Sequence, residues 1–412
     1  MRDLDDRLRS FGEGRTPDLW EGIRRREPRP EASIRPRVPG LIAGAVALLV
    51  AVAGLALVVR AFQTDRTARP AEDVENGAGP SEAVVTGTTQ VAEFPNAVAV
   101  GEGGVWISAP RNDGSGAGDV VRLDPSTGEV IARIPVDGLP GWETGGGGMA
   151  VGLGSVWVTG NIYEGAGPDR TIVSQIDPAT NEVADVIDLG PGYDADVAVD
   201  PSAIWILVFT RDHDTLEVVR LDPVTHEETA RIPIDGIWSQ EVFVGEGAIW
   251  VNAAQPHPKY DDTVGASTLT RIYTATNEVT LALPGAEFVE STDPADGIVW
   301  AWTHDGLVPL DAATGDAVGD PVLSVRRSWA VGLEEPILVD GTGAWFYGYA
   351  DDAASWVLSH MDLETGEVTA SAELGADTQG NRWWIVAAAV DPSSGVAWVV
   401  HYRDNVSRME FR

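Results

Sequence analysis

The 412-residue sequence predicts an all-β fold in which seven similar four-stranded units follow one transmembrane helix. Three observations lead to this expectation. A run of uncharged apolar residues lies near the N-terminus, a tryptophan-containing motif then recurs along the chain, and a turn motif follows most of those tryptophans. With 44% apolar and 22% charged residues, the chain is long and apolar enough to bury a large core.

Acidic residues dominate the composition: 63 Asp and Glu stand against 28 Lys and Arg, which gives a net charge of -35. Nucleic acid is a poor partner for such a chain, because phosphate binding needs clustered basic residues. The lack of cysteine excludes disulfides, thiolate zinc sites and cysteine nucleophiles. Residues 82–412 carry a charge of -36, whereas residues 1–37 carry +2 and residues 60–81 carry -1.

The apolar run, GLIAGAVALLVAVAGLALVV, extends from Gly40 to Val59. As a helix it would cross a hydrocarbon core of about 30 Å. A buried core helix would rarely be apolar on every face, and a cleaved signal peptide has a shorter apolar region. Arginines concentrate on the N-terminal side, so the positive-inside bias places the N-terminus in the cytoplasm.

These features predict a single-pass cell-membrane protein with four parts. Residues 60–81 contain few large apolar side chains, which is typical of a flexible linker. We therefore expect a cytoplasmic Arg-rich stub at 1–39, a transmembrane helix at 40–59, the linker at 60–81, and an extracytoplasmic domain at 82–412.

A short apolar run that ends in tryptophan occurs seven times in the domain, at intervals of 45 to 53 residues. Copies such as AVAVGEGGVWIS and MAVGLGSVWVT consist of two apolar strands around a turn, which is typical of a β-hairpin. Packing between neighbouring units explains these tryptophans without a ligand. They are Trp106, Trp157, Trp205, Trp250, Trp300, Trp345 and Trp398.

A second motif, of the form Asp-Pro-x-Thr-Gly, follows the first six tryptophans, as in VVRLDPSTGEVIARIPV at 120–136. Asp-Pro at the start of a turn and Gly or Asn near its end favour a tight reversal between two strands. One repeat therefore contains four strands, here named a, b, c and d, over about 49 residues. Repeats of this size and strand number form the blades of a β-propeller.

The seventh repeat lacks its outer d strand, because the chain ends after VSRMEFR. At the other end of the domain, the segment 83–94 takes the place of a d strand before the first hairpin. We expect this N-terminal strand to complete the seventh blade and close the ring, which removes exposed sheet edges.

The phrases DPATNEVADVIDLG and DPSTGEVIARIPV resemble the repeat of YVTN/YncE-like β-propellers, a class of WD40/YVTN-like repeat proteins. The Gly-rich hairpins are also similar to those of streptogramin lyase-like propellers. This resemblance implies an enzyme that uses a histidine in a metal-assisted ring opening. The resemblance covers residues of about 83–412. The order of stub, span and propeller resembles that of actinobacterial membrane proteins, and so does the use of 27 Arg against one Lys.

The strand connections of a propeller lie on two faces. The a–b and c–d turns share one face, named here the turn face, and the d–a and b–c connections share the other, named the loop face. The loop-face connections are long and differ in every blade, and variable loops on a rigid scaffold usually carry binding. Ordinary solvated loops are the alternative. The candidate ligand- or partner-binding residues in these loops are Trp142, Arg170, Arg211, His213, Trp238, His257, His304, Arg326, Arg327, Trp329, Arg382, Trp383, His401 and Arg403.

Two functions are compatible with this pattern. The first is a ligand- or protein-binding module, sensory or scaffolding, whose stub could bind a cytoplasmic protein. The alternative is an extracytoplasmic lyase-like enzyme with a metal-assisted site at the propeller centre. No two of the histidines have a metal-ligand spacing such as H-x-x-x-H, so the sequence assigns neither a metal site nor a catalytic residue. Acidic stretches at 211–214 and 260–262 could hold a divalent cation or be solvated turns.

Overall fold

The computed structural model divides into two compact units, Met1–Asn76 and Gly77–Arg412, and the described residues all lie in the second. The predicted stub, transmembrane helix and all but the last residue of the linker are outside the described residues. No helix among the described residues is long and apolar enough to span a membrane. The structure describes residues 81–411 except 93, 112–115, 140–147, 163–169, 211–214, 237–241, 246, 257–263, 285, 290–296, 304–305, 322–332, 340–342, 350–355, 364–367, 376–384, 392–393, 395 and 402–403.

Four antiparallel sheets with four strands each follow one another along the chain. In each sheet the strands pair in sequence order, which gives the predicted a–b–c–d meander. The first sheet contains β2 (Ala97–Gly101), β3 (Gly104–Pro110), β4 (Ala117–Leu123) and β5 (Val130–Asp137), and the second contains β6 (Met149–Gly152), β7 (Ser155–Ile162), β8 (Arg170–Asp177) and β9 (Glu182–Pro191). The third contains β10 (Tyr193–Asp200), β11 (Ala203–Thr210), β12 (Thr215–Leu221) and β13 (Glu228–Ile234), and the fourth contains β14 (Val242–Gly245), β15 (Ala248–Pro256), β16 (Val264–Tyr273) and β17 (Val279–Pro284).

The remaining described strands form a fifth sheet of three strands and one sheet of eight strands. The fifth sheet contains β18 (Ala286–Val289), β19 (Ile298–Thr303) and β20 (Gly306–Asp311). The eight-stranded sheet has the order β21-β22-β23-β24-β1-β27-β26-β25. Its strands are β21 (Leu333–Val339), β22 (Gly343–Tyr349), β23 (Trp356–Asp362), β24 (Val368–Gly375), β1 (Ser81–Ala92), β27 (Asp404–Phe411), β26 (Val396–His401) and β25 (Ile385–Asp391).

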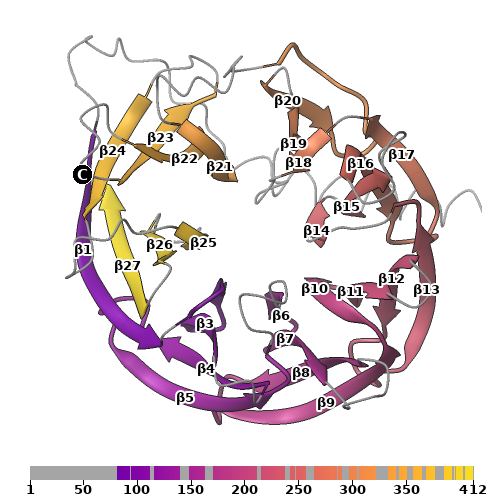
Figure 1. The fold of residues 1–412 in the computed structure, drawn as a ribbon, viewed down its shortest axis with the longest axis horizontal. Coiled ribbons are helices and arrows are strands. Elements are labelled where there is room, and N and C mark those ends of the chain that lie inside the picture. Colours follow the sequence, from indigo (N-terminus) through magenta and orange to yellow (C-terminus); the bar gives the residue numbers. More distant parts are fainter. Residues whose placement is uncertain are drawn as a thin grey trace, which may run out of the picture. The chain divides into compact units, whose positions relative to one another are not determined.

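Within this unit the sheets follow one another around a ring (Figure 1). The first strand of each sheet lies toward the centre, and the outer strands β5, β9, β13 and β17 follow the circumference. This arrangement is a β-propeller with four-stranded antiparallel blades, as the repeats predict.

The described residues form six separate hydrogen-bonded sheets, whereas the sequence predicts seven blades. The difference arises within the eight-stranded sheet. Here β24 and β1 pair in parallel through two residue pairs, Ser81 with Ala370 and Glu82 with Ser371. This short contact joins β21–β24 to a second antiparallel group of β25, β26, β27 and β1.

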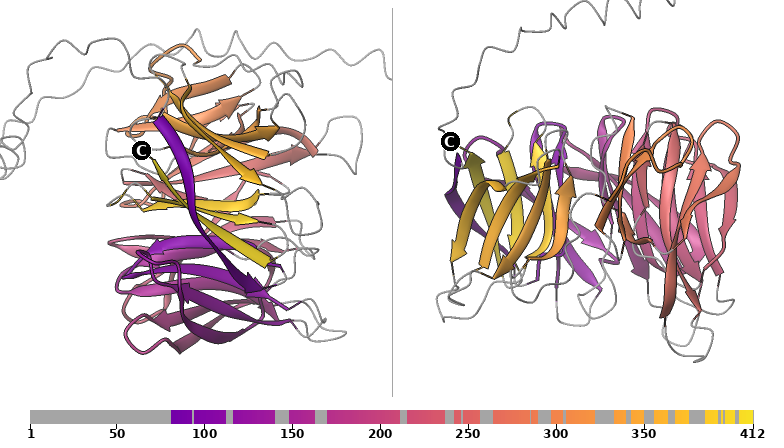
Figure 2. Two further views of the ribbon diagram at one scale, coloured as in Figure 1. Left: turned by 90° about the vertical axis from the view of Figure 1, so that its left-hand side faces the viewer. Right: turned by 90° about the horizontal axis from the view of Figure 1, so that it is seen from above.

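The predicted closure by the N-terminal strand is confirmed. Strand β1 pairs antiparallel with the last strand, β27, from Ala83 opposite Phe411 to Ala92 opposite Asp404. Figure 2 shows the two strands lying alongside each other. The Thr89 hydroxyl also donates a 2.7 Å hydrogen bond to the Gly128 carbonyl of the first sheet. The chain therefore closes its ring with main-chain hydrogen bonds between its first and last described strands.

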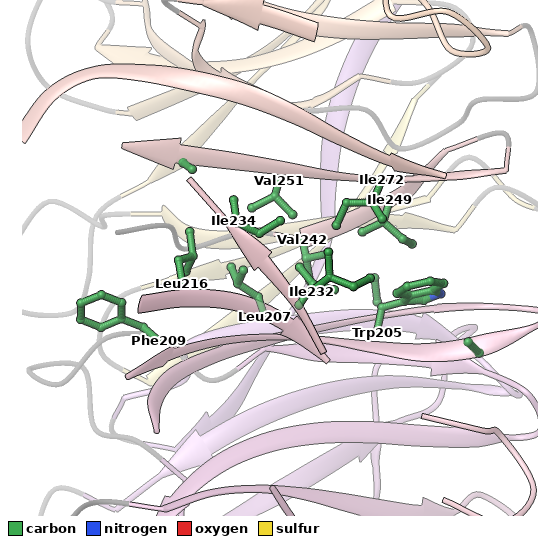
Figure 3. Close-up of a cluster of buried hydrophobic side chains, with 14 residues drawn as sticks. Trp205, Leu207, Phe209, Leu216, Ile232, Ile234, Val242, Ile249, Val251 and Ile272 are labelled. Carbon is green, nitrogen blue, oxygen red and sulfur yellow. The ribbon is translucent and has the colours of Figure 1, made fainter. Parts of the chain in front are cut away.

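Apolar side chains fill the space between adjacent sheets. The largest cluster joins the third and fourth sheets, where Trp205, Leu207 and Ile232 of one approach Ile249 and Val251 of the other (Figure 3). Similar clusters join the first sheet to the second, the second to the third and the fourth to the fifth. Another joins the first sheet to β26 and β27 and includes Val91 of β1. The hydrophobic core of the domain is therefore distributed between the blades, as is expected when each sheet buries both faces.

Six of the seven repeated tryptophans belong to such a cluster, and five of them are almost fully buried. In the first sheet, Trp106 lies directly opposite Arg122, whose guanidinium carbon is 4.7 Å from the indole centroid. Arg122 Nη1 then donates to the Pro178 carbonyl at 2.6 Å and to Asn181 Oδ1 at 2.8 Å. Both acceptors belong to the c–d turn of the second sheet. This Trp–Arg–turn contact therefore links one blade to the next.

The contact recurs at two other interfaces with small changes. Arg220 stacks on Trp205 and donates to Asn277 Oδ1 of the fourth sheet at 3.0 Å. Arg408 stacks on Trp398 and donates to the Pro125 carbonyl of the first sheet. We name these contacts, together with that of Arg122, the Trp–Arg–turn layer.

The c–d turns have a special backbone position that allows this contact. In the five c–d turns that the structure describes, the fifth residue has a φ between 57° and 80°, and its amide donates to the carbonyl four residues before it. Glycine, asparagine and histidine tolerate this left-handed conformation better than most residues. These residues are Gly128, Asn181, His226, Asn277 and Gly315.

We predict that shortening a buried side chain of β1 destabilises the whole domain. Val91 is 2% exposed, so Val91→Ala should cost about 1–3 kcal/mol of unfolding free energy. The matched control is Val130→Ala, since Val130 on β5 is 39% exposed and its truncation should cost under about 0.5 kcal/mol. Urea denaturation of the full-length chain measures both. Equal effects would show that β1 adds nothing to the stability of the ring.

Candidate functional site

The turn face and the loop face differ in how the structure uses them. On the turn face, the c–d turns of the first, second and fourth sheets accept the hydrogen bonds of the Trp–Arg–turn layer. Twelve of the fourteen candidate binding residues lie in loop-face connections outside the described residues, and they stay predictions. These are Trp142, Arg211, His213, Trp238, His257, His304, Arg326, Arg327, Trp329, Arg382, Trp383 and Arg403.

Arg170, the first of the two described candidates, begins β8 at the loop face. Its Nε donates to Asp188 Oδ2 of β9 at 3.1 Å, and its Nη2 donates to the same oxygen. The hydrogen bonds from Arg170 hold the pKa of Asp188 below its usual range. The positive charge of Arg170 is therefore paired within its own blade. Arg111, which follows β3, is similarly paired with Asp119 at 3.2 Å.

His401, the second described candidate, is the last residue of β26 and is fully buried. Its Nε2 lies 2.8 Å from the hydroxyl of Ser407, which is itself 1% exposed and 3.4 Å from the Thr88 hydroxyl of β1. Burial lowers the pKa of His401 to about 3, so the ring is neutral at physiological pH. A neutral imidazole in this position connects the b strand to the c strand and faces no solvent.

The structure also shows polar contacts at the loop face that the sequence did not indicate. They join the inner strands of three successive sheets. The Val242 amide of β14 donates to Asp196 Oδ2 of β10 at 2.8 Å. The Gly148 amide donates to the Thr159 hydroxyl at 2.7 Å, and the Thr159 amide returns a 3.0 Å bond to the Gly148 carbonyl.

Gly148 must remain a glycine for this arrangement to form. A Cβ atom on Gly148 would lie 1.9 Å from Asp196 Oδ1 and 2.6 Å from its Cα. Asp196 therefore packs directly against the second sheet while it accepts a hydrogen bond from the fourth. We name Gly148, Thr159, Asp196 and Val242 the inner-strand contact. In the sequence, this contact corresponds to the glycine-rich stretch that ends at Gly148 and to Asp196 before the third hairpin, and neither feature identifies it.

Two buried polar atoms lie beside this region. Asn161 of β7 and Thr171 of β8 face each other in the second sheet, and they are 2% and 0% exposed. Neither Asn161 Oδ1 nor Thr171 Oγ1 has a hydrogen-bond partner among the described residues. Such atoms usually bind water or another polar group, because leaving them unpaired is costly. The loop-face end of the second sheet is thus able to accept or donate further hydrogen bonds.

Within the described part of the chain, no group of three or more His, Asp or Glu residues is arranged to hold a metal ion. The acidic stretches that could hold a divalent cation, 211–214 and 260–262, lie outside that part. Of the predicted histidines, only His401 can be placed.

Comparisons with known proteins add no family to these observations. No protein-family model matches the chain, and no curated protein matches it. The resemblance to YVTN/YncE-like propellers therefore stays a prediction.

We predict that Gly148→Ala destabilises the domain, because the added methyl group cannot fit against Asp196. The expected cost is about 1–3 kcal/mol of unfolding free energy. Gly87→Ala is the matched control, since a Cβ atom at Gly87 would meet nothing within 4 Å. Chemical denaturation of the two full-length variants compares them. A Gly148 variant as stable as the Gly87 variant would refute the close approach of the inner strands.

We also predict that burial of His401 makes stability depend on pH. Its folded pKa of about 3 lies below the unfolded value of 6.5, so the unfolded state binds more protons between these two values. Stability should therefore fall as the pH drops below 6.5, by roughly 2 kcal/mol at pH 5 from this group. The measurement is the denaturation midpoint at pH 7.5 and pH 5, with His401→Gln as the comparison. An unchanged pH dependence in that variant would contradict the assignment.

Proposed function

We propose that the chain is a single-pass membrane protein that displays a seven-bladed propeller outside the cell and binds a ligand or protein through its loop face. The observation that carries this proposal is the difference between the two faces. Four of the five described c–d turns are engaged in hydrogen bonds between sheets, whereas the long and dissimilar connections all belong to the opposite face. A rigid ring that leaves its variable loops on one face is suited to binding.

The seven-bladed, YVTN/YncE-like form of the proposal rests on the eight-stranded sheet being two blades. Two features support this count. The groups β21–β24 and β25–β27 with β1 each contain four strands, and each has its own repeated tryptophan, Trp345 and Trp398. The only strand pairing between the two groups in the described chain is the two-residue parallel contact of β24 with β1.

Placement of the propeller outside the cell rests on the N-terminal sequence. The uncharged run of Gly40–Val59 and the excess of arginine before it favour a span with a cytoplasmic N-terminus. In this arrangement β1, which closes the ring, is also the first described strand after the proposed linker. The stub could then connect binding outside the cell to a cytoplasmic protein.

A lyase-like enzyme is the alternative function, and the structure supports it less well. It needs an accessible histidine, and His401, which the structure does describe, is buried and neutral. We therefore propose a binding module and no catalytic residue.

The proposed topology can be tested with single cysteines, because the natural chain has none. Val224, in a c–d turn, is 85% exposed, so a Val224→Cys variant should react with a membrane-impermeant maleimide on intact bacteria. A Ser10→Cys variant in the stub should react only after lysis. The opposite pattern, or equal labelling of both variants before lysis, would contradict an extracytoplasmic propeller.

Binding through the loop face can be tested by site-specific crosslinking. We expect a photoreactive amino acid at Trp142, Trp238 or Trp329 to form covalent adducts with envelope components in living cells. The same group at Val224 on the turn face should form few, and Arg326→Glu with Arg327→Glu should reduce the adducts at Trp329. Equal crosslinking from both faces would contradict a dedicated loop face.

A further inference from the structure

Four arginines lie directly opposite a repeated tryptophan in the neighbouring strand. They are Arg122, Arg220, Arg271 and Arg408. Each guanidinium stacks on its tryptophan, at distances between 4.7 and 6.0 Å from carbon to ring centroid. In three of the four, the guanidinium also donates hydrogen bonds to the c–d turn of the next sheet.

Arg271 of β16 is the exception, although it is the most deeply buried of the four. It is 2% exposed, and its Nε and Nη1 atoms have no hydrogen-bond partner among the described residues. Its guanidinium carbon lies 3.8 Å from the ring centroid of Tyr273 and 5.6 Å from that of Trp250. These rings stabilise the cation through their faces. They leave the two nitrogen atoms Nε and Nη1 without a hydrogen-bond acceptor in the described part of the chain.

One difference from the interfaces of Arg122 and Arg220 lies in the sequence of the next turn. By the register of the repeats, the turn that corresponds to the one contacted by Arg122 is 311–315 of the fifth sheet. Where that turn of the second sheet has Asn181 and that of the fourth has Asn277, the fifth has Gly315. Glycine satisfies the left-handed backbone, with a φ of 80°, but offers no side-chain oxygen.

The surroundings of Trp250, on which Arg271 stacks, do not compensate for this loss. The buried cluster that contains Trp250 is apolar and includes Leu269, Val299, Leu310 and Ala312. No ion pair joins Arg271 to a carboxylate of the described residues. A buried cation without a counter-charge or acceptors is strongly destabilising.

We propose that Arg271 binds a small monovalent anion, such as chloride, between the fourth and fifth sheets. The anion takes the role that the Asn181 and Asn277 side chains have at the equivalent interfaces. A halide supplies a negative charge and accepts several N–H groups, and it has no donors of its own that would need partners in an apolar site. This inference is independent of the function proposed for the loop face.

The test is the thermal unfolding midpoint of the full-length chain in increasing sodium chloride, against sodium gluconate at the same ionic strength. A specific anion should raise the midpoint saturably, by roughly 2–4 °C at one hundred times its dissociation constant. Bromide should act like chloride. Coinciding chloride and gluconate curves would overturn the proposal.

Two variants at one position separate a specific site from a general salt effect. Gly315→Asn supplies the missing oxygen, so it should remove the chloride-dependent shift and raise the midpoint measured in gluconate. Gly315→Ala supplies no acceptor, so it should retain the chloride-dependent shift at lower overall stability. If Gly315→Asn kept the full shift, the anion would not be bound at Arg271 and the proposal would fail.

A variant elsewhere in the ring provides the final control. Arg122→Met disturbs the same layer at an interface that already has Asn181, so the chloride-dependent shift should persist. Loss of the shift in Arg122→Met but not in Arg271→Met would also overturn the proposal. Crystals soaked in bromide should show an anomalous peak beside the Arg271 guanidinium, and a clear absence of that peak would count against the site.

Discussion

One constraint is shared by three interfaces of the propeller: an arginine stacked on a buried tryptophan donates hydrogen bonds to the next sheet. Arg122 shows it most fully, because it contacts Trp106 in its own sheet and both Pro178 and Asn181 in the neighbouring turn. The tryptophan supplies apolar contact area between blades. The arginine sets the position of one blade relative to the next through its hydrogen bonds. A turn that moved would leave a partly buried guanidinium unpaired.

This constraint explains why the two faces of the ring are free to serve different purposes. The c–d turns that accept these hydrogen bonds must keep their backbone conformation, because the arginine of the preceding blade donates to their carbonyl oxygens or to the side chain of the fifth residue. No contact of this repeated kind occurs among the described residues at the loop face. At their inner ends, the described contacts are specific to particular blades, as with Asp196 against Gly148. Chemical variety can therefore accumulate in the loops without disturbing the contacts that hold the blades together.

Much of the fold was predictable, because repeats report the strand order and the tryptophan positions directly. The closing role of β1 followed from a missing strand at the other end of the chain, and its pairing with β27 confirms it. The parallel contact of Ser81 and Glu82 with β24 was not predictable, since two residue pairs leave no periodic pattern. That contact is the reason that the described chain has six separate sheets.

Less of the candidate site could be predicted, for a physical reason. Sequence can identify an arginine in a loop, but it does not show whether a carboxylate already pairs with it, as Asp188 does with Arg170. It also does not show burial, which makes His401 neutral. The distinction among Asn181, His226 and Gly315 becomes meaningful only once the register places each beside the preceding blade. His226, for example, meets Trp157 edge-on and pairs with Asp185.

The most direct measurement for this account is a double-mutant cycle across the first interface of the ring. Arg122→Met and Asn181→Gly would be made singly and together in the full-length chain, with glycine chosen because it keeps the left-handed turn. If the Trp–Arg–turn layer couples the blades, the two changes should show an interaction energy of about 1–2 kcal/mol. If their effects on unfolding free energy simply add, within about 0.3 kcal/mol, the layer does not hold the blades together.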